Sequence, residues 1–393
     1  TLIGKNSGYA ITTGTNNVVV GALSGDAMTS SSNCVLVGKN TGGAINSADA
    51  DGTVAVGHSA LTALTSGERN IAIGYQAMDA LPDGDDNIAL GYQALTDAST
   101  STTVRNIAIG SYSLNNLNAN CSDNVAIGHK SLENATNNDI DSNIAIGSYV
   151  MDGITSQGVW GCVGIGTSVM TGAVTSVASG TVAIGYNALT AMTSGAGNTA
   201  VGFQAMDELT TGDYNTAVGY QALHQCDSGE GNCTAVGYLA GGNLDGGVNN
   251  TFIGDNTTVG TTNDDNNTVI GSQSTGGGSN STVLGYNTTG QAANSVTLGN
   301  TNVTAVYMAQ DSGATVHCAG INFPDTFSDN ADVNVLDDYE EGSWTPVITD
   351  GSNNATMSGT YNAGLYTKIG RIVHISGYVV VTSLGSVSGD IKI

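Results

Sequence analysis

The sequence predicts an all-β protein, a β-solenoid followed by a small all-β domain. The first observation is a pattern, clearest in Asn70-Ile-Ala-Ile-Gly74, that recurs every 17 to 19 residues over three quarters of the chain. The second is composition: 10% of the 393 residues are charged, against roughly 25% in ordinary globular domains, and there are 56 Gly but only 3 Pro. One short strand per repeat, joined by glycine-rich corners, is typical of stacked coils.

Every copy of the pattern ends in a glycine, the repeat glycine, which follows an aliphatic residue. The spacing falls to 14 residues before each of the last two copies. The repeat glycines are Gly4, Gly21, Gly38, Gly57, Gly74, Gly91, Gly110, Gly128, Gly147, Gly166, Gly185, Gly202, Gly219, Gly237, Gly254, Gly271, Gly285 and Gly299.

The positions one and three before each repeat glycine share one face of the expected strand, because side chains alternate along a strand. They are aliphatic or threonine, whereas the position between them is mostly alanine. We expect the larger residues, with Ile127 near the middle of their column, to form the core. The alanine face is then expected to lie outside, where another backbone can approach closely.

Two further positions have a predicted structural role. The position four before the repeat glycine is Asn in ten copies and Cys34, Cys162 or Cys233 in three others, which predicts side chains stacked by hydrogen bonds. The repeat glycine is expected to turn a corner or to admit a close neighbour.

A second apolar column is predicted four residues after the repeat glycine. From Leu61 to Leu223 this position is always Leu or Met, but in the first three coils it is Gly8, Gly25 and Gly42. We therefore expect a thinner core in residues 1 to about 50.

The chain is predicted to divide into three parts. Residues 1–302 form the solenoid rod, 303–340 a connector that ends in an acidic run, and 341–393 the start of a small all-β tip domain, which we expect to be truncated. Residues 344–348 and 366–381 are expected strands of this domain, and Trp344 is expected in its core. Because the sequence begins inside a repeat, we expect a segment of a longer polypeptide, with other fibre or particle proteins upstream.

Charge and hydropathy exclude two classes of partner. Eight Lys and Arg against 33 Asp and Glu give a formal charge of -25, and phosphate backbones repel such a surface, so no nucleic-acid binding is expected. No run of about 18 apolar residues is present, so the chain is not expected to span a membrane.

The six cysteines are predicted to be unpaired and buried. Coils lie ~4.8 Å apart, so cysteines several coils apart are out of reach of one another, and only Cys226 and Cys233 are close enough in sequence for a local disulfide. The others are Cys34, Cys121, Cys162 and Cys318.

No catalytic, cofactor or metal site is predicted. The five histidines (His58, His129, His224, His317 and His374) are scattered, without the spacing of metal ligands. Residues 83–86 and Asp264-Asp265 are interpreted as solvated acidic turns, with a calcium ion as the alternative.

Aromatic residues commonly follow the repeat glycine directly. We interpret this column as a cover for the solenoid flank; the alternative is a carbohydrate-binding strip. Its members are His58, Tyr75, Tyr92, His129, Tyr186, Phe203, Tyr220, Tyr238 and Tyr286.

The Asn-x-Ala-Ile-Gly copies, above all the 14-residue ones ending in Ser295-Val-Thr-Leu-Gly299, resemble the head repeats of YadA-type trimeric autotransporter adhesins. The resemblance covers residues 1 to about 300 and implies a homotrimer of left-handed β-rolls, although the 17 to 19 residue spacing departs from it. Residues 320–324, 336–346 and 366–370 are similar to sequences near the ends of phage tail fibres. The adhesins' neck, stalk and anchor have no counterpart here.

These resemblances imply an extracellular virion fibre without enzymatic activity, a homotrimer that attaches to a host cell-surface receptor, either a glycan or a protein. The alternatives are a bacterial trimeric autotransporter-type adhesin and a tailspike-like glycan-degrading enzyme, which would need carboxylates paired across a groove. Specificity is expected after about residue 341 and in the longest turns between coils, at 97–104, 115–123, 134–142 and 152–161.

Overall fold

The computed structural model describes residues 1–46, 48–96, 103–116, 121–134, 140–154, 159–174, 178–307, 339–369 and 372–387. The chain divides into two compact units, Thr1–Val306 and Tyr307–Ile393. Among the described residues the only helical element is a short 3-10 turn, η1 (Ala48–Ala50), and none is long and apolar enough to cross a membrane.

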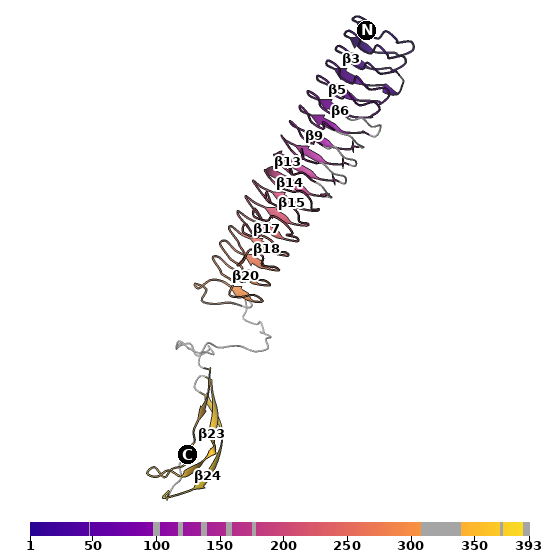
Figure 1. Ribbon diagram of the computed structural model, residues 1–393. Helices are drawn as coiled ribbons and strands as arrows, with labels where there is room; N and C mark the ends of the chain where they lie inside the picture. The colour runs from indigo at the N-terminus through magenta and orange to yellow at the C-terminus, as the bar shows by residue number, and fades with distance from the viewer. Residues whose placement is uncertain are drawn as a thin grey trace. The chain divides into compact units, whose positions relative to one another are not determined.

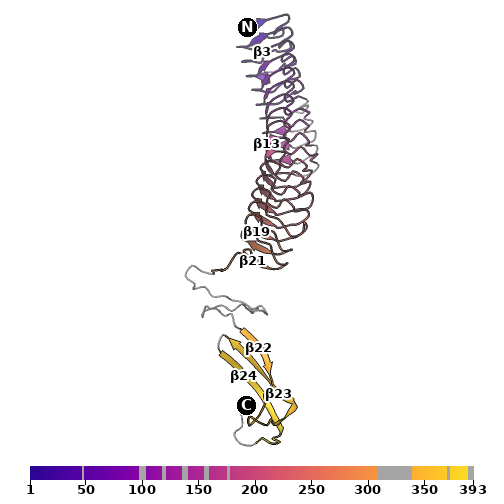
Figure 2. The ribbon, with the colours of Figure 1, turned by 90° about the vertical axis from the view of Figure 1, so that its left-hand side faces the viewer.

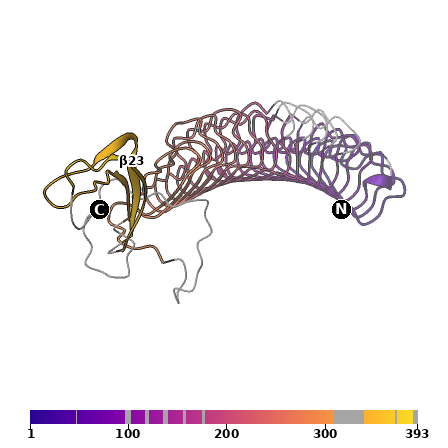
Figure 3. The same cartoon turned by 90° about the horizontal axis from the view of Figure 1, so that it is seen from below.

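The first unit is a parallel β-solenoid, as predicted. Each coil adds one short strand to a single sheet of 18 strands (Figures 1 and 2). Seen from below, the coils lie one behind the other in a gently curved row (Figure 3). Neighbouring strands pair equivalent positions, so that Ile71, Ala72 and Ile73 lie beside Ile88, Ala89 and Leu90. The repeat in the sequence is therefore also the register of the sheet.

The strands of this sheet are β1 (Leu2–Ile3), β2 (Val18–Val20), β3 (Val35–Val37), β4 (Val54–Val56), β5 (Ile71–Ile73), β6 (Ile88–Leu90), β7 (Ile107–Ile109), β9 (Val125–Ile127), β11 (Ile144–Ile146), β13 (Val163–Thr167), β14 (Val182–Tyr186), β15 (Thr199–Val201), β16 (Thr216–Val218), β17 (Thr234–Val236), β18 (Thr251–Ile253), β19 (Thr268–Ile270), β20 (Thr282–Leu284) and β21 (Val296–Leu298). A second parallel sheet joins β8 (Cys121–Ser122), β10 (Ile140–Asp141) and β12 (Val159–Trp160).

The predicted orientation of the strands is wrong. Ala126 is completely buried, whereas Val125 and Ile127 on either side of it remain partly exposed. The same pattern holds along the sheet, so the alanines face the interior and the aliphatic pair faces outward.

The physical reason for this reversal is the narrow interior of the coil. The second apolar column, from Leu61 to Leu223, is buried as predicted and lies against the inner side of the strands. A Cβ added to Gly164, at the middle position of β13, would lie 2.6 Å from Val150 and 3.0 Å from Met151. Only a small residue fits opposite a Leu or Met.

The core of the first coils is not thinner, because the two inner positions exchange volume. Where the second column is Gly25 or Gly42, the strand carries Val19 and Leu36 at its middle position, and both are fully buried. A Cβ on Gly42 would lie 3.2 Å from Leu36. Phe252 similarly lies against Gly241. In these cases a large residue, of the same coil or of the next, fills the space beside a glycine.

The repeat glycine has the predicted role of a close approach between coils. Gly74 has a φ of +143°, a conformation that L side chains rarely adopt, and an added Cβ would overlap the backbone of Gly91 in the next coil. No other residue fits there without moving the neighbouring coil.

The asparagines form the predicted ladder. The backbone N of Asn87 donates a hydrogen bond to Oδ1 of Asn70 (3.0 Å), and Nδ2 of Asn87 donates to the carbonyl oxygen of Thr103 (2.8 Å). The pattern repeats through Asn106, Asn124 and Asn143, all fully buried.

Five of the cysteines are confirmed as buried and not bonded in a disulfide: Cys34, Cys121, Cys162, Cys226 and Cys233. The disulfide between Cys226 and Cys233 is thus not formed. Burial raises the pKa of Cys233 to about 11 and that of Cys226 well above its usual value, so both remain thiols at neutral pH. Cys318 lies outside the described residues.

The second unit contains an antiparallel sheet ordered β22 (Tyr339–Trp344), β23 (Thr356–Ile369) and β24 (Ile372–Ser383). Its first strand begins inside the predicted connector and includes part of the acidic run, while the expected strand at 344–348 does not form. Trp344 is half-buried rather than enclosed in a core. The sheet exposes apolar side chains, including Leu365, Ile372 and Tyr378.

Candidate interaction face

The outward side of the 18-stranded sheet is the most distinctive surface of the solenoid. We call it the outer sheet face and define it by the residues three before, one before and one after each repeat glycine. In β14 these residues are Val182, Ile184 and Tyr186, which share one side of the strand while Ala183 is buried on the other. Three columns of side chains therefore run along the whole sheet.

Two of these columns contain no charged residue. Their exposure is substantial for aliphatic side chains, for example 43% for Leu90 and 41% for Ile253. From β15 to β20 the column three residues before the repeat glycine changes from aliphatic residues to threonine, beginning with Thr199 and Thr216, and β21 has Val296 there. An apolar surface of this length is uncommon on a soluble monomer and usually marks an interaction site.

Between His58 and Tyr238 the third column forms a ladder of aromatic rings. Tyr75 and Tyr92 stack with ring centroids 5.4 Å apart, and Phe203 and Tyr220 stack at 5.0 Å. The ladder has two runs, interrupted at Thr167. The rings in contact are His58, Tyr75, Tyr92, Tyr112, His129 and Tyr149, then Tyr186, Phe203, Tyr220 and Tyr238.

Sequence reasoning missed Tyr112 and Tyr149, which lie two residues after the repeat glycine rather than one. Their rings reach the same column and contact their neighbours edge to face. Lys130 lies between them, with its Nζ 5.8 Å from the Tyr112 ring centroid and 3.0 Å from Glu133. The hydrogen bond to Glu133 raises the pKa of Lys130. In these two coils the residue directly after the repeat glycine is serine (Ser111 and Ser148), and this change in the sequence could have indicated that the aromatic residue is shifted by one place.

The acidic turns singled out as calcium alternatives have partners of their own. Asp83 accepts hydrogen bonds from Ser66 (2.5 Å) and Thr65 (2.8 Å), which lower its pKa. Asp86 is paired with Arg69. Residues 83–86 therefore belong to a network that joins neighbouring coils.

The second pair of calcium candidates is divided between two backbone donors. Asp264 accepts from the backbone N of Thr261 (2.7 Å), and Asp265 from that of Val248 (2.8 Å). These two carboxylates thus hold turns rather than face a common centre.

The described residues do bring together one acidic group that the sequence analysis did not single out. Asp227, Glu230 and Asp245 come from consecutive turns, with potential ligand atoms within 4.8 Å of one another. Their sequence signal was weak, because Asp227-Ser-Gly-Glu resembles an ordinary turn.

The histidines show no common site in the part of the chain that the structure describes. His58 and His129 belong to the aromatic ladder, and Nδ1 of His224 lies 2.5 Å from Asp207 on the preceding coil. His317 lies outside the described residues, as do residues 97–102, 117–120, 135–139 and 155–158 of the long turns expected to carry specificity.

A hollow of about 920 Å³ runs along turns of the middle coils. Its two acidic lining residues are held by the backbone: Asp213 accepts from the N of Ala196 (2.8 Å) and Glu230 from the N of Gly246 (2.6 Å). Both carboxylates have a structural partner, so the hollow does not single out an acid and base pair.

No protein-family model matches the chain, and no curated protein matches it.

Proposed function

We propose that this chain is a structural and adhesive segment of an extracellular virion fibre that assembles as a homotrimer and attaches the particle to a host cell surface. The observation that carries the proposal is the outer sheet face, in which an uncharged pair of columns extends over 18 strands beside an aromatic ladder that runs in two parts from His58 to Tyr238. At ~4.8 Å per strand this face is about 80 Å long.

The partner that fits this face best is another copy of the same chain. The face presents one row of equivalent residues per coil, so only a surface whose rows have the same spacing can contact all of them. Burying such side chains contributes roughly 25 cal/mol per Å² of apolar area. Closed cyclic symmetry then limits growth to a defined oligomer, and the resemblance to trimeric adhesin heads favours three copies.

The assignment to a virion rests on the second unit. Residues 336–346 and 366–370 resemble phage tail-fibre sequences, and they include β22 and the end of β23. A uniform rod suits a spacer, whereas the non-repeating unit offers a unique surface. We therefore assign receptor binding to the second unit and the role of a spacer to the solenoid.

Assembly is tested by light scattering of the purified chain and of Ile127→Asp. We expect the parent to have three times the 39.3 kDa chain mass. Ile127 is on the outer sheet face, so the variant should fold but dissociate, because three carboxylates would be buried without partners at the interface. A monomeric parent would contradict the proposal.

Ala173→Asp is the matched control. Ala173 is exposed in a turn between coils. The variant therefore adds the same charge near the middle of the solenoid but away from the outer sheet face. It should remain a trimer with an unchanged circular dichroism spectrum. Dissociation of both variants would show a general effect of charge rather than an interface at the sheet.

A further inference from the structure

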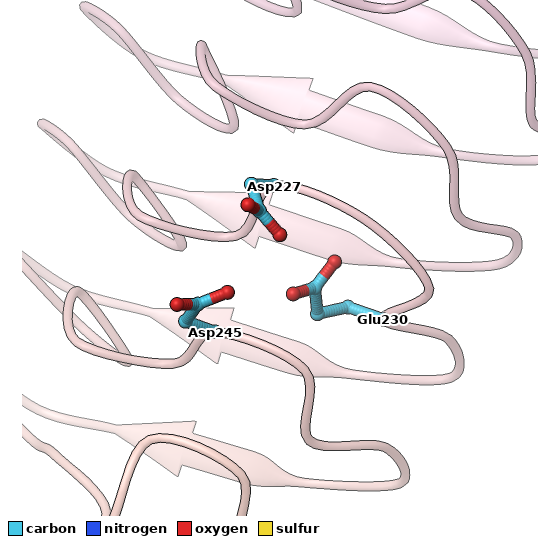
Figure 4. A group of neighbouring side chains, drawn as sticks. All are labelled: Asp227, Glu230 and Asp245. Carbon is cyan, nitrogen blue, oxygen red and sulfur yellow. The ribbon is translucent and has the colours of Figure 1, made fainter.

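We propose that Asp227, Glu230 and Asp245 bind a calcium ion that joins two consecutive coils of the solenoid. Figure 4 shows the three carboxylates directed toward one another from neighbouring turns. Asp227 and Glu230 lie between β16 and β17, and Asp245 lies between β17 and β18.

Glu230 differs from an ordinary acidic turn residue because its carboxylate is buried. Its side chain is completely buried, and Oε1 accepts a hydrogen bond from the backbone N of Gly246 (2.6 Å), but the buried Oε2 has no hydrogen-bond partner. An ionised carboxylate in such a place is costly unless it is paired or binds a metal. Oε2 of Glu230 is therefore a donor atom that a cation could use.

The position of Glu230 in the repeat makes it more unusual. It lies seven residues before the repeat glycine Gly237, where neighbouring coils have Gly212 and Gly247. The backbone there is part of the ladder, since Nδ2 of Asn215 donates to the carbonyl oxygen of Glu230 (2.9 Å). A long acidic side chain thus occupies a site at which glycine is sufficient for the fold.

The two aspartates also occupy equivalent positions, eight residues after Gly219 and Gly237. Like charges at equivalent positions of adjacent strands repel each other. The hydrogen bond with Asp227, followed by its charge, raises the pKa of Asp245, while burial raises that of Glu230. A cation at this point would remove both penalties.

The chain itself supplies no cation here. No Lys or Arg lies between Lys130 and Lys368, although the solenoid part of that segment carries many Asp and Glu. His224, the nearby histidine, is paired with Asp207 (2.5 Å) and lies 3.8 Å from Glu208. The solenoid after Lys130 therefore offers these carboxylates no basic side chain other than histidine.

The donor set is that of a hard cation. Calcium prefers six to eight oxygens at about 2.3–2.6 Å, so two oxygens on opposite sides of the ion are roughly 4.8 Å apart. The potential ligand atoms lie within 4.8 Å of one another. Three carboxylates give up to six oxygens, and Asp227 and Asp245 are exposed enough to share the ion with water.

The test is calorimetric titration of calcium chloride into the chelator-stripped full chain, with thermal melts in parallel. We expect one ion per chain, and a rise in the unfolding midpoint of roughly 4–8 °C at a hundredfold excess over the dissociation constant. Glu230→Gln and Asp245→Asn should abolish both. Asp26→Asn, a control acid in a turn near the start of the stack, should bind calcium as the parent does.

Other results would overturn the assignment. Absence of calcium binding by the parent would mean that Glu230 is kept neutral by a proton, and binding retained by Glu230→Gln would place the ion elsewhere. An equal midpoint shift with magnesium would contradict a calcium site. Because Glu230→Gln replaces a buried charge by a neutral side chain of the same shape, it should fold and be more stable than the parent in chelator.

Discussion

At the scale of single residues, the interior of the solenoid is governed by exchange of volume between two positions. The middle strand residue and the residue four after the repeat glycine lie against each other, so Ala pairs with Leu or Met, and Leu36 pairs with Gly42. The alternation of residues in the sequence correctly separates two faces. It does not tell which face is inside, because the usual preference for large apolar residues in a core is overridden by the width of the coil.

The volume exchange predicts a rescue. Ala200→Leu should overpack the coil and cost about 1–3 kcal/mol, and Met206→Gly should cost about 2–5 kcal/mol. Both parent side chains are fully buried. The double variant reproduces the arrangement of Leu36 and Gly42, so denaturant unfolding should show a favourable coupling of about 1–2 kcal/mol.

The control for this cycle combines Met206→Gly with Ala72→Leu, an equally buried alanine far along the stack. The two costs should then add, because distant sites do not share partners. Additive behaviour of the Ala200 pair as well would contradict the proposed contact.

At the scale of elements, the Asn ladder links each coil to the next through side chains that replace backbone partners. Asn in ten copies made this ladder predictable. Less of the second small sheet was predictable, because β8, β10 and β12 lie in turns whose length varies. Turn length also hid the acidic group, since the extra residue before Gly237 moves Glu230 into the position that glycine occupies in both neighbouring coils. The repeat motif describes a single coil, so it does not show which residues of two consecutive turns lie next to each other.

Asn106→Ala should weaken the ladder locally. Asn106 accepts from the backbone N of Asn124 (3.0 Å) and donates to the carbonyl oxygen of Cys121 (2.8 Å). In the variant the backbone N of Asn124 would lose this partner at a fully buried position, and the Cys121 carbonyl would keep only the backbone N of Val104 (3.2 Å). We expect a loss of about 1–3 kcal/mol in the free energy of unfolding. Asn46→Ala, in an exposed turn, should change it by less than ~0.5 kcal/mol. Equal effects would show that the ladder contributes no more than a surface residue.

At the scale of the whole molecule, repetition and uniqueness are separated along the chain. The unit Thr1–Val306 presents nearly the same surface in every coil, and Tyr307–Ile393 does not repeat. The sequence was sufficient to predict this division, because loss of the pattern after Gly299 needs no three-dimensional information. It was not sufficient to place the strands of the second unit, where β22 begins at Tyr339 within an acidic run that has little strand propensity.

The division predicts where binding specificity resides. A variant that ends at Asn300 retains the outer sheet face and every strand of the solenoid, so it should still form a trimer by light scattering. Its binding to host cells should fall to background, whereas the full chain should bind, because unique surface is built by non-repeating segments. Ile127→Asp is the complementary variant. It keeps the second unit but should lose the gain in apparent affinity that three linked binding sites give, which is commonly 10²-fold or more. If the trimeric variant ending at Asn300 binds as well as the full chain, the receptor site belongs to the solenoid, at its turns or at the exposed edge of the aromatic ladder, and the second unit acts in assembly.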